Sequence, residues 1–190
     1  MPGFLKMLLP LVVVVVLMTP YPASSTAQHP DRLVYKGETV PIFSNPLETF
    51  FDASHRRPYF PRGSTACWRG YIATWKIENE YMYLVRMQDC TQEKKEIPLA
   101  TVFEDRPEPV KADWFSGTLR IPRGNMLRYV HMGYGSVYER DLFLTIEKGK
   151  LVGEQVVDNT KTRVPSEDER AIDELIKLGE WEDNIRKNRE

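Results

Sequence analysis

The sequence predicts a mainly β fold, an antiparallel sandwich or small barrel of roughly eight strands, followed by a C-terminal amphipathic helix. Short apolar and aromatic segments recur between turn residues, and no helical segments alternate with them. Aromatic residues make up 11% of the chain, which favours strands. Near the end of the chain the apolar spacing changes from the strand period to the helical one.

Residues 1–27 have the composition of a signal peptide. Lys6 gives a positive start, residues 7–18 are almost wholly apolar, and Ser25-Thr26-Ala27 supplies the small residues that precede a cleavage site. A bilayer-spanning helix needs about 20 apolar residues, whereas this run is shorter and contains Pro10. We therefore expect an exported protein, periplasmic or secreted, with no stable membrane span after cleavage. A retained membrane anchor is the alternative.

Length and composition indicate one globular domain. The chain has 190 residues, of which 42% are hydrophobic and 28% are charged, an ordinary mixture for a folded protein. The net charge is −1, whereas a nucleic-acid binder normally carries a strong basic excess. We therefore expect a β-rich domain over residues 28–165 that does not bind nucleic acid.

Two hairpins begin this domain. Residues 33–35 and 39–43 flank the turn Lys36-Gly37, and residues 52–66 form a long loop. The second hairpin joins residues 67–77 to residues 81–90 around Glu78-Asn79-Glu80. If Ile77 pairs with Tyr81, one face becomes continuously apolar and ends in a charge pair, with the pairs Trp75–Tyr83, Ala73–Val85, Tyr71–Met87 and Arg69–Asp89.

The remaining strands are shorter predictions. They cover residues 110–114, 118–121 and 126–132, and a third hairpin joins residues 141–146 to 151–157 around Glu147-Lys148-Gly149. Residues 166–190 differ from this pattern. They open with the capping box Ser166-Glu167-Asp168-Glu169 and continue with an apolar stripe at helical spacing, made of Ala171, Ile172, Leu175, Ile176 and Leu178. This helix packs on its own sheet or serves as an arm for a partner.

The only two cysteines, Cys67 and Cys90, are expected to form a disulfide. An even cysteine count in an exported chain indicates a bridge, and their spacing fits neither a redox motif nor a zinc site. Closing a loop of this size contributes about 3 kcal/mol in the chain-entropy model. The proposed hairpin register sets Cys67 opposite Thr91, however, so a direct bridge requires a bulge or a one-residue slip.

The densest collection of chemical groups lies in one predicted turn. His131, Tyr134, Ser136, Tyr138 and Glu139 are candidates for a ligand site or an active site. Ser136 as nucleophile with His131 as base describes a hydrolase, and Glu139 with a second acid describes a glycosidase. The stretch fits neither the G-x-S-x-G elbow nor a phosphate loop. The alternative is a glycine-kinked turn with tyrosines packed over it.

Metal and cofactor sites are not expected. The chain contains three histidines, His29, His55 and His131, and they do not have the spacing of metal ligands.

Exposed aromatic side chains are the second candidate binding feature. Trp68 points away from the proposed apolar face and Trp114 is the next candidate, since flat rings stack on the apolar faces of sugars. The alternative is a second buried layer. Residues 56–62 interleave arginines with Tyr59 and Phe60, which fits either a stacking surface or a loop whose arginines meet local carboxylates.

Three segments resemble an uncharacterised family of bacterial exported proteins, namely CWRGYIATW at 67–75, ADWFSGTLRIP at 112–122 and YVHMGYGSVYE at 129–139. The resemblance covers about residues 31–152. It implies a bacterial, exported, single-domain protein and assigns no activity and no catalytic residue.

Three hypotheses about function follow from the sequence. The first is a non-enzymatic exported module that binds a partner protein or a cell-envelope glycan. The second is a small extracytoplasmic hydrolase centred on the turn from His131 to Glu139. The third is an assembly or scaffold protein that uses the C-terminal helix.

Overall fold

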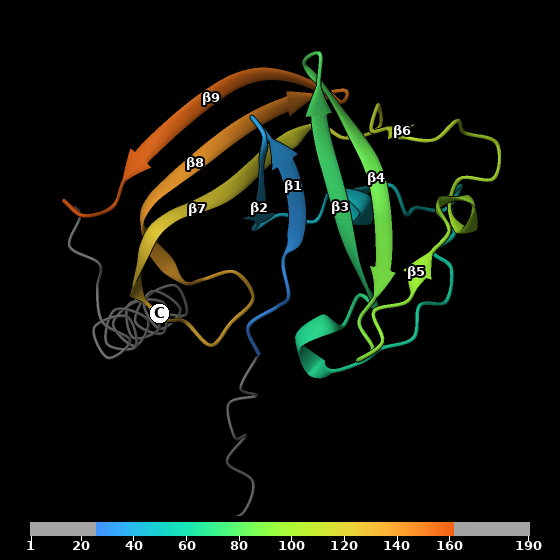
Figure 1. Ribbon diagram of the computed structural model, residues 1–190, viewed down its shortest axis with the longest axis horizontal. Coiled ribbons are helices and arrows are strands. Elements are labelled where there is room, and N and C mark those ends of the chain that lie inside the picture. Colours follow the sequence, from blue (N-terminus) through green and yellow to red (C-terminus); the bar gives the residue numbers. More distant parts are fainter. Residues whose placement is uncertain (1–25, 162–190) are drawn as a thin grey trace, which may run out of the picture.

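The structure is a computed structural model that describes residues 26–161. Nine strands form one mixed sheet with the order β2-β1-β3-β4-β9-β8-β7, and β5 and β6 pair with β4 beside this path. Figure 1 shows the long strands β7, β8 and β9 curving together on one side and β1 to β4 on the other. The predicted mainly β fold is confirmed. The predicted helix at 166–190 and most of the predicted signal peptide lie outside the described residues.

The first hairpin is confirmed. β1 (Asp31–Tyr35) and β2 (Glu38–Ile42) pair antiparallel around Lys36-Gly37. Both turn residues have positive φ, of 50° and 83°, as the tight turns that suit a twisted hairpin require. Alternation along β1 turns Leu33 and Tyr35 into the core and leaves Arg32 on the outer face.

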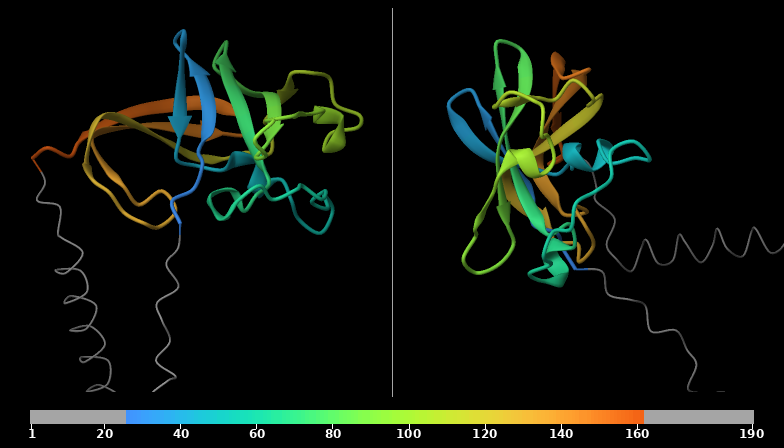
Figure 2. Two further views of the ribbon diagram at one scale, coloured as in Figure 1. Left: turned by 60° about the horizontal axis from the view of Figure 1, so that its bottom comes forward. Right: turned by 90° about the vertical axis from the view of Figure 1, so that its right-hand side faces the viewer.

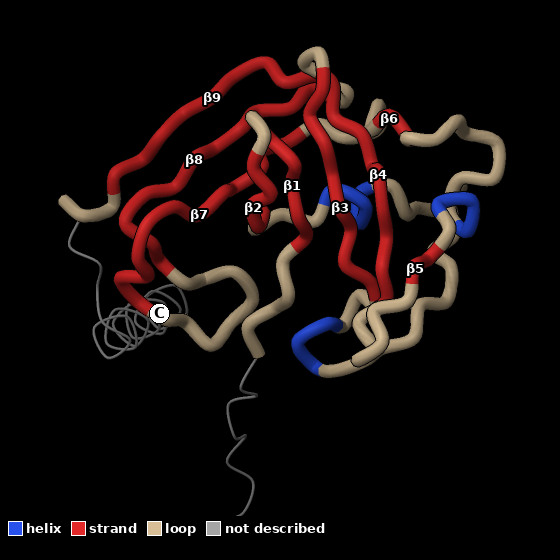
Figure 3. Tube along the Cα trace, in the orientation of Figure 1, coloured by secondary structure: helices blue, strands red, loops and turns tan. Residues whose placement is uncertain are grey.

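The prediction of a purely antiparallel sheet is wrong at one place, because β1 pairs parallel with β3 (Tyr71–Glu78), setting Leu33 beside Trp75. Parallel neighbours need a long connection. The chain between them supplies it through the short 3₁₀ helix η2 (Pro46–Thr49), the loop of residues 52–64 and the 3₁₀ helix η3 (Thr65–Cys67). Figure 3 shows that these connections are loops with single helical turns.

The second hairpin forms with a different register. β3 pairs with β4 (Tyr81–Asp89) so that Glu78 faces Tyr81, and the turn is the two residues Asn79-Glu80, both with positive φ. A register shift between Thr74 and Trp75 adds a bulge. Several predicted pairs are therefore wrong, since Trp75 faces Leu84 and Tyr71 faces Asp89. The buried face of β4 consists of Met82, Leu84, Met87 and Asp89.

The predicted disulfide between Cys67 and Cys90 is present. Cys67 ends η3 and Cys90 follows β4 directly. The slip and the bulge of the hairpin do not produce this bridge, because they move the pairing away from a match of Cys67 with Cys90, to Tyr71 facing Asp89. The bridge forms outside the paired strands, since Cys67 lies in η3 and β3 begins only at Tyr71.

The rest of the sheet is a three-stranded meander. β7 (Gly117–Arg128), β8 (Val137–Glu147) and β9 (Lys150–Asp158) pair antiparallel, and the hairpin at Lys148-Gly149 confirms the third predicted turn. The separately predicted strands at 118–121 and 126–132 fall in this one strand β7, except that residues 129–132 lie beyond its end. Besides η3, three elements are only two or three residues long, namely β5 (Glu96–Ile97), η4 (Leu99–Thr101) and β6 (Val110–Lys111).

The two end strands of the sheet meet. Phe43 N, just after β2, donates to Arg120 O of β7 at 2.7 Å, and Ser44 Oγ donates to Thr118 O at 3.0 Å. The two views of Figure 2 show the β1–β4 group leaning across β7–β9. The space between these two groups is filled by fully buried side chains, which include Leu33, Ile42, Trp75, Leu84, Leu119, Ile121, Leu144 and Ile146.

Candidate functional site

The five side chains proposed from the turn at residues 131–139 do not converge on a shared ligand position. The Ser136 hydroxyl is buried and accepts the Val130 N–H at 3.1 Å. The exposed His131 ring lies edge-on to Tyr129, with ring centroids 5.0 Å apart. Within residues 26–161, no hydrogen bond joins Ser136 to His131. The nucleophile and base of the predicted hydrolase are therefore not paired.

Tyr134, Tyr138 and Glu139 also have separate partners. The Tyr134 ring stacks on Phe43 at 5.0 Å, and the Tyr138 ring meets the same phenylalanine edge-on at 5.8 Å. Glu139 Oε1 accepts Asn125 Nδ2 at 3.0 Å, and this hydrogen bond lowers the pKa of Glu139. A carboxyl with a lowered pKa is a poor general acid at neutral pH.

Arg120 fixes the shape of this turn. Its guanidinium donates to Tyr134 O at 2.8 Å and to Ser136 O at 2.9 Å. The same group forms a bidentate pair with the buried Asp141, at 2.9 and 3.0 Å. A planar guanidinium is suited to such fixed multiple bonds. With these contacts the turn acts as a structural element, in agreement with the alternative interpretation of the sequence, a kinked turn with tyrosines packed over it.

A buried ionic network lies behind the turn, and no local pattern of residues predicts it. Arg69 Nη2 donates to Asp31 Oδ1 at 3.0 Å, and the Asp31 carboxylate also accepts Ala73 N and Trp75 Nε1, each at 3.1 Å. The predicted pairing of Arg69 with Asp89 is therefore wrong, because Arg69 precedes β3 and turns toward β1. Asp89 instead accepts bonds from Thr91 and Lys95 in its own turn.

This network reaches Tyr134. Arg69 Nη1 donates to the Tyr134 hydroxyl at 2.9 Å, and that hydroxyl donates to Asn45 Oδ1 at 2.8 Å. Burial raises the pKa of Tyr134 to about 12. Burial also raises the pKa of Asp31 above its ordinary value, although the Arg69 charge opposes this shift. The network joins four separate segments of the chain.

Trp68 lies at the surface on a rigid support. Its side chain is 47% exposed, and the Arg57 guanidinium carbon lies 5.7 Å from its ring centroid. The residues on either side are fixed, since Cys67 is in the disulfide and Arg69 is buried. Gly70 then turns the chain into β3 with φ of +80°, where a Cβ atom would lie 2.7 Å from Phe60.

The other aromatic candidate, Trp114, is not freely exposed. It is half-buried, its ring stacks on Phe103 at 5.1 Å, and its Nε1 donates to Pro46 O at 3.3 Å. The expectation of an exposed ring is therefore wrong at this position, because Pro46 of η2 and Phe103 contact it. Tyr59, in the loop beside Arg57, is 88% exposed. Arg57 itself pairs with Glu48, a local carboxylate.

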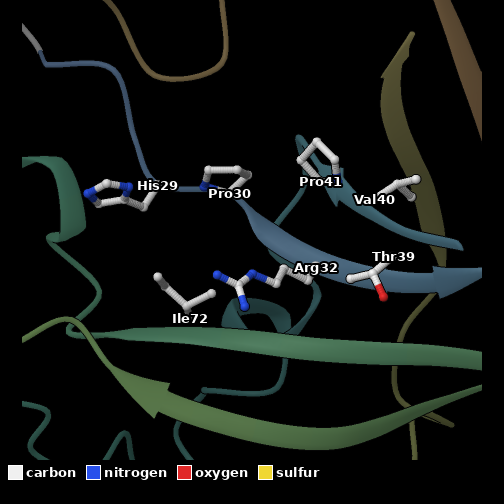
Figure 4. A pocket seen from close by; sticks show the side chains of 7 residues that line it. All are labelled: His29, Pro30, Arg32, Thr39, Val40, Pro41 and Ile72. Atoms are coloured by element: carbon white, nitrogen blue, oxygen red, sulfur yellow. The ribbon is translucent and has the colours of Figure 1, made fainter. Parts of the chain in front are cut away.

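A small pocket of about 210 Å³ opens on the outer face of β1, β2 and β3. It is lined by His29, Pro30, Arg32, Thr39, Val40, Pro41 and Ile72. Figure 4 shows the Arg32 guanidinium between the β1 ribbon and Ile72, with His29 at one end. The pocket combines apolar walls with two basic side chains.

Over residues 26–161, no three His, Cys, Asp or Glu side chains are grouped as a metal ion would require. In the same range, no helix has the length and apolar character needed to cross a membrane.

Comparisons with known proteins identify no relative. No protein-family model matches the chain, and no curated protein and no solved structure matches it either. The resemblance to uncharacterised bacterial exported proteins therefore stays a prediction.

Proposed function

We propose that this protein is an exported, non-catalytic module that binds a glycan of the cell envelope through Trp68. The observation that carries the proposal is the half-exposed indole on an immobilised support. Sugar rings have an apolar face that packs against a flat aromatic ring, and a ring already held in place loses little freedom on binding.

The chemistry of the turn at residues 131–139 agrees with a non-catalytic role. The Ser136 hydroxyl, the Tyr134 hydroxyl and the Glu139 carboxylate are each engaged with a different partner. No observation favours the hydrolase hypothesis. The scaffold hypothesis concerns residues 166–190, which lie outside the described residues.

Export supports the choice of an envelope ligand. The apolar run at residues 7–18 predicts export, and a disulfide is typical of proteins that work in an oxidising compartment. We therefore place the protein in the periplasm or outside the cell, where envelope glycans are accessible.

The proposal is tested by co-sedimentation of the purified protein with insoluble peptidoglycan, chitin and cellulose. We expect the wild type to bind at least one of these polymers, and Trp68→Ala to lose at least tenfold in affinity. Tyr129→Ala is the matched control, since Tyr129 is also about half exposed, at 49%, but lies after β7. Binding of the control should not change.

Two results would contradict the proposal. One is that the wild type binds none of the polymers. The other is that Trp68→Ala, with an unchanged far-UV circular dichroism spectrum, binds as well as the wild type. Binding to crude envelope that disappears after protease treatment would point to a protein partner in place of a glycan.

A further inference from the structure

We infer that the glycan is acidic, and that a carboxylate on it enters the pocket of His29, Arg32 and Ile72 while a sugar ring stacks on Trp68. This inference rests on the proposed function and adds the chemical class of the ligand.

The pocket carries positive charge that the surrounding protein does not neutralise. Its lining contains Arg32 and His29 and no Asp or Glu. Among the ion pairs of residues 26–161, none includes Arg32. An exposed guanidinium beside apolar walls is well suited to a planar carboxylate, which it binds through two parallel hydrogen bonds.

The two nearest acidic residues along the chain are already engaged elsewhere. Asp31, next to Arg32, points to the opposite face of β1 and pairs with Arg69. Glu38, at the start of β2, pairs with Arg123 of β7 at 2.9 Å. Because side chains alternate along the strand, Asp31 and Arg32 lie on opposite faces of β1, and Asp31 does not neutralise Arg32.

The size of the pocket fits one substituent of a sugar and excludes a whole oligosaccharide. Its volume is about 210 Å³, and pockets that enclose complete drug-sized ligands measure about 300–1,000 Å³. One guanidinium matches a single negative charge, whereas a phosphate monoester carries about −1.5 to −2. A carboxylate attached to a ring that stays outside the pocket satisfies both limits.

The pocket and the segment that carries Trp68 are linked through the backbone of His29. His29 N donates to Ala66 O at 2.8 Å, and His29 O accepts Arg69 Nη2 at 2.9 Å. Ala66 and Arg69 lie on either side of the Cys67-Trp68 pair. The segment that carries the indole is thus bonded on both sides to the residue at one end of the pocket, and the inferred ligand spans the two.

The test compares pairs of soluble oligosaccharides that differ mainly in their carboxylates. One pair is chitohexaose and a peptidoglycan glycan strand, which adds a lactyl carboxylate to alternate sugars. The other is cellohexaose and its C6-carboxylated counterpart. Calorimetry should show at least tenfold tighter binding of the acidic member of a pair by the wild type, and a smaller preference at high salt.

Three variants separate this inference from the proposed function. Arg32→Gln should bind the neutral sugar as before and lose the acidic preference. Ile72→Trp, which fills the pocket, should have the same effect. Arg140→Gln removes an exposed arginine from β8 and should keep the preference.

Each other outcome has a distinct meaning. Equal binding of neutral and acidic sugars by the wild type, or an acidic preference that survives in folded Arg32→Gln, would overturn the inference and leave the Trp68 proposal standing. Absence of binding to all four sugars, together with absence of binding to the insoluble polymers, would overturn the proposed function and the inference with it.

Discussion

Asp31 and Arg69, which are 38 residues apart in the sequence, form a buried ion pair with N and O atoms 3.0 Å apart and side chains 0% and 2% exposed. Removing one charge from such a pair leaves the other buried without compensation, which typically costs about 3–5 kcal/mol. We expect Asp31→Asn to lower the free energy of unfolding by this amount in urea denaturation.

The matched control for this variant is Asp113→Asn. Asp113 pairs with Arg106 at 2.7 Å, but its side chain is 55% exposed. Exposed ion pairs contribute little, so the control should change stability by less than about 1 kcal/mol. A similar effect of both variants would mean that the buried network is not a main source of stability.

The disulfide between Cys67 and Cys90 supports the segment that carries Trp68. Replacing both cysteines with serine should lower the free energy of unfolding by about 3 kcal/mol, because the unfolded chain gains freedom. Dithiothreitol should destabilise the wild type by a similar amount and leave the double variant unchanged. If the wild type keeps its disulfide and still has the same free energy of unfolding as the double variant, this expectation is contradicted.

Tyr134 gives the protein a defined dependence on alkaline pH. Its pKa is raised from 10.0 to about 12 in the folded state, so the folded state holds the phenolic proton more tightly than the unfolded state. The resulting stability is present in full below pH 10 and is lost as pH rises through about 12, since the unfolded chain ionises first.

The measurement is the difference in unfolding free energy between the wild type and Tyr134→Phe, in urea at pH 9 and at pH 11. The difference should shift by about 1.4 kcal/mol in favour of the variant at the higher pH, as one pH unit above the ordinary pKa implies. Other tyrosines and lysines titrate equally in both proteins, so a constant difference would show that Tyr134 is not the group responsible.

Ser136 and His131 should behave as independent residues. Ser136→Ala leaves the buried Val130 N–H without its acceptor and should cost about 1–3 kcal/mol of stability. His131→Ala removes an exposed ring and should cost less than about 0.5 kcal/mol. In the double variant these changes should add, whereas a coupling above about 0.5 kcal/mol would revive the nucleophile-and-base pairing of the hydrolase hypothesis.

The hairpins were predictable because their signals are local. Lys36-Gly37 and Lys148-Gly149 occupy turns that need positive φ, and alternating apolar residues flank them. The middle hairpin was predicted with the wrong register because Asn79 and Glu80, neither of them glycine, both adopt positive φ and shorten the turn to two residues. The bulge beside Thr74 then shifts the pairing once more.

The contacts that the sequence did not reveal are those between distant segments. The parallel pairing of β1 with β3 depends on a long connection that has no pattern of its own. The partners of Tyr134 are Asn45 and Arg69, which come from two other segments of the chain. The sequence suggested a site at residues 131–139 because several chemical groups lie close together there in the chain. In the structure these groups bind partners from distant segments, and they therefore support the fold.

The contacts of Ala27 and Gln28 affect when the predicted signal peptide can be removed during biosynthesis. Gln28 N donates to Gly133 O at 3.1 Å, and Ala27 forms a parallel bridge with Gly133. If the signal peptide is removed after Ala27, as the sequence predicts, the bond to be hydrolysed joins these two residues. A peptidase needs that backbone extended and free, so removal of the leader must precede the docking of this segment. A precursor that folds first would hide its own cleavage site.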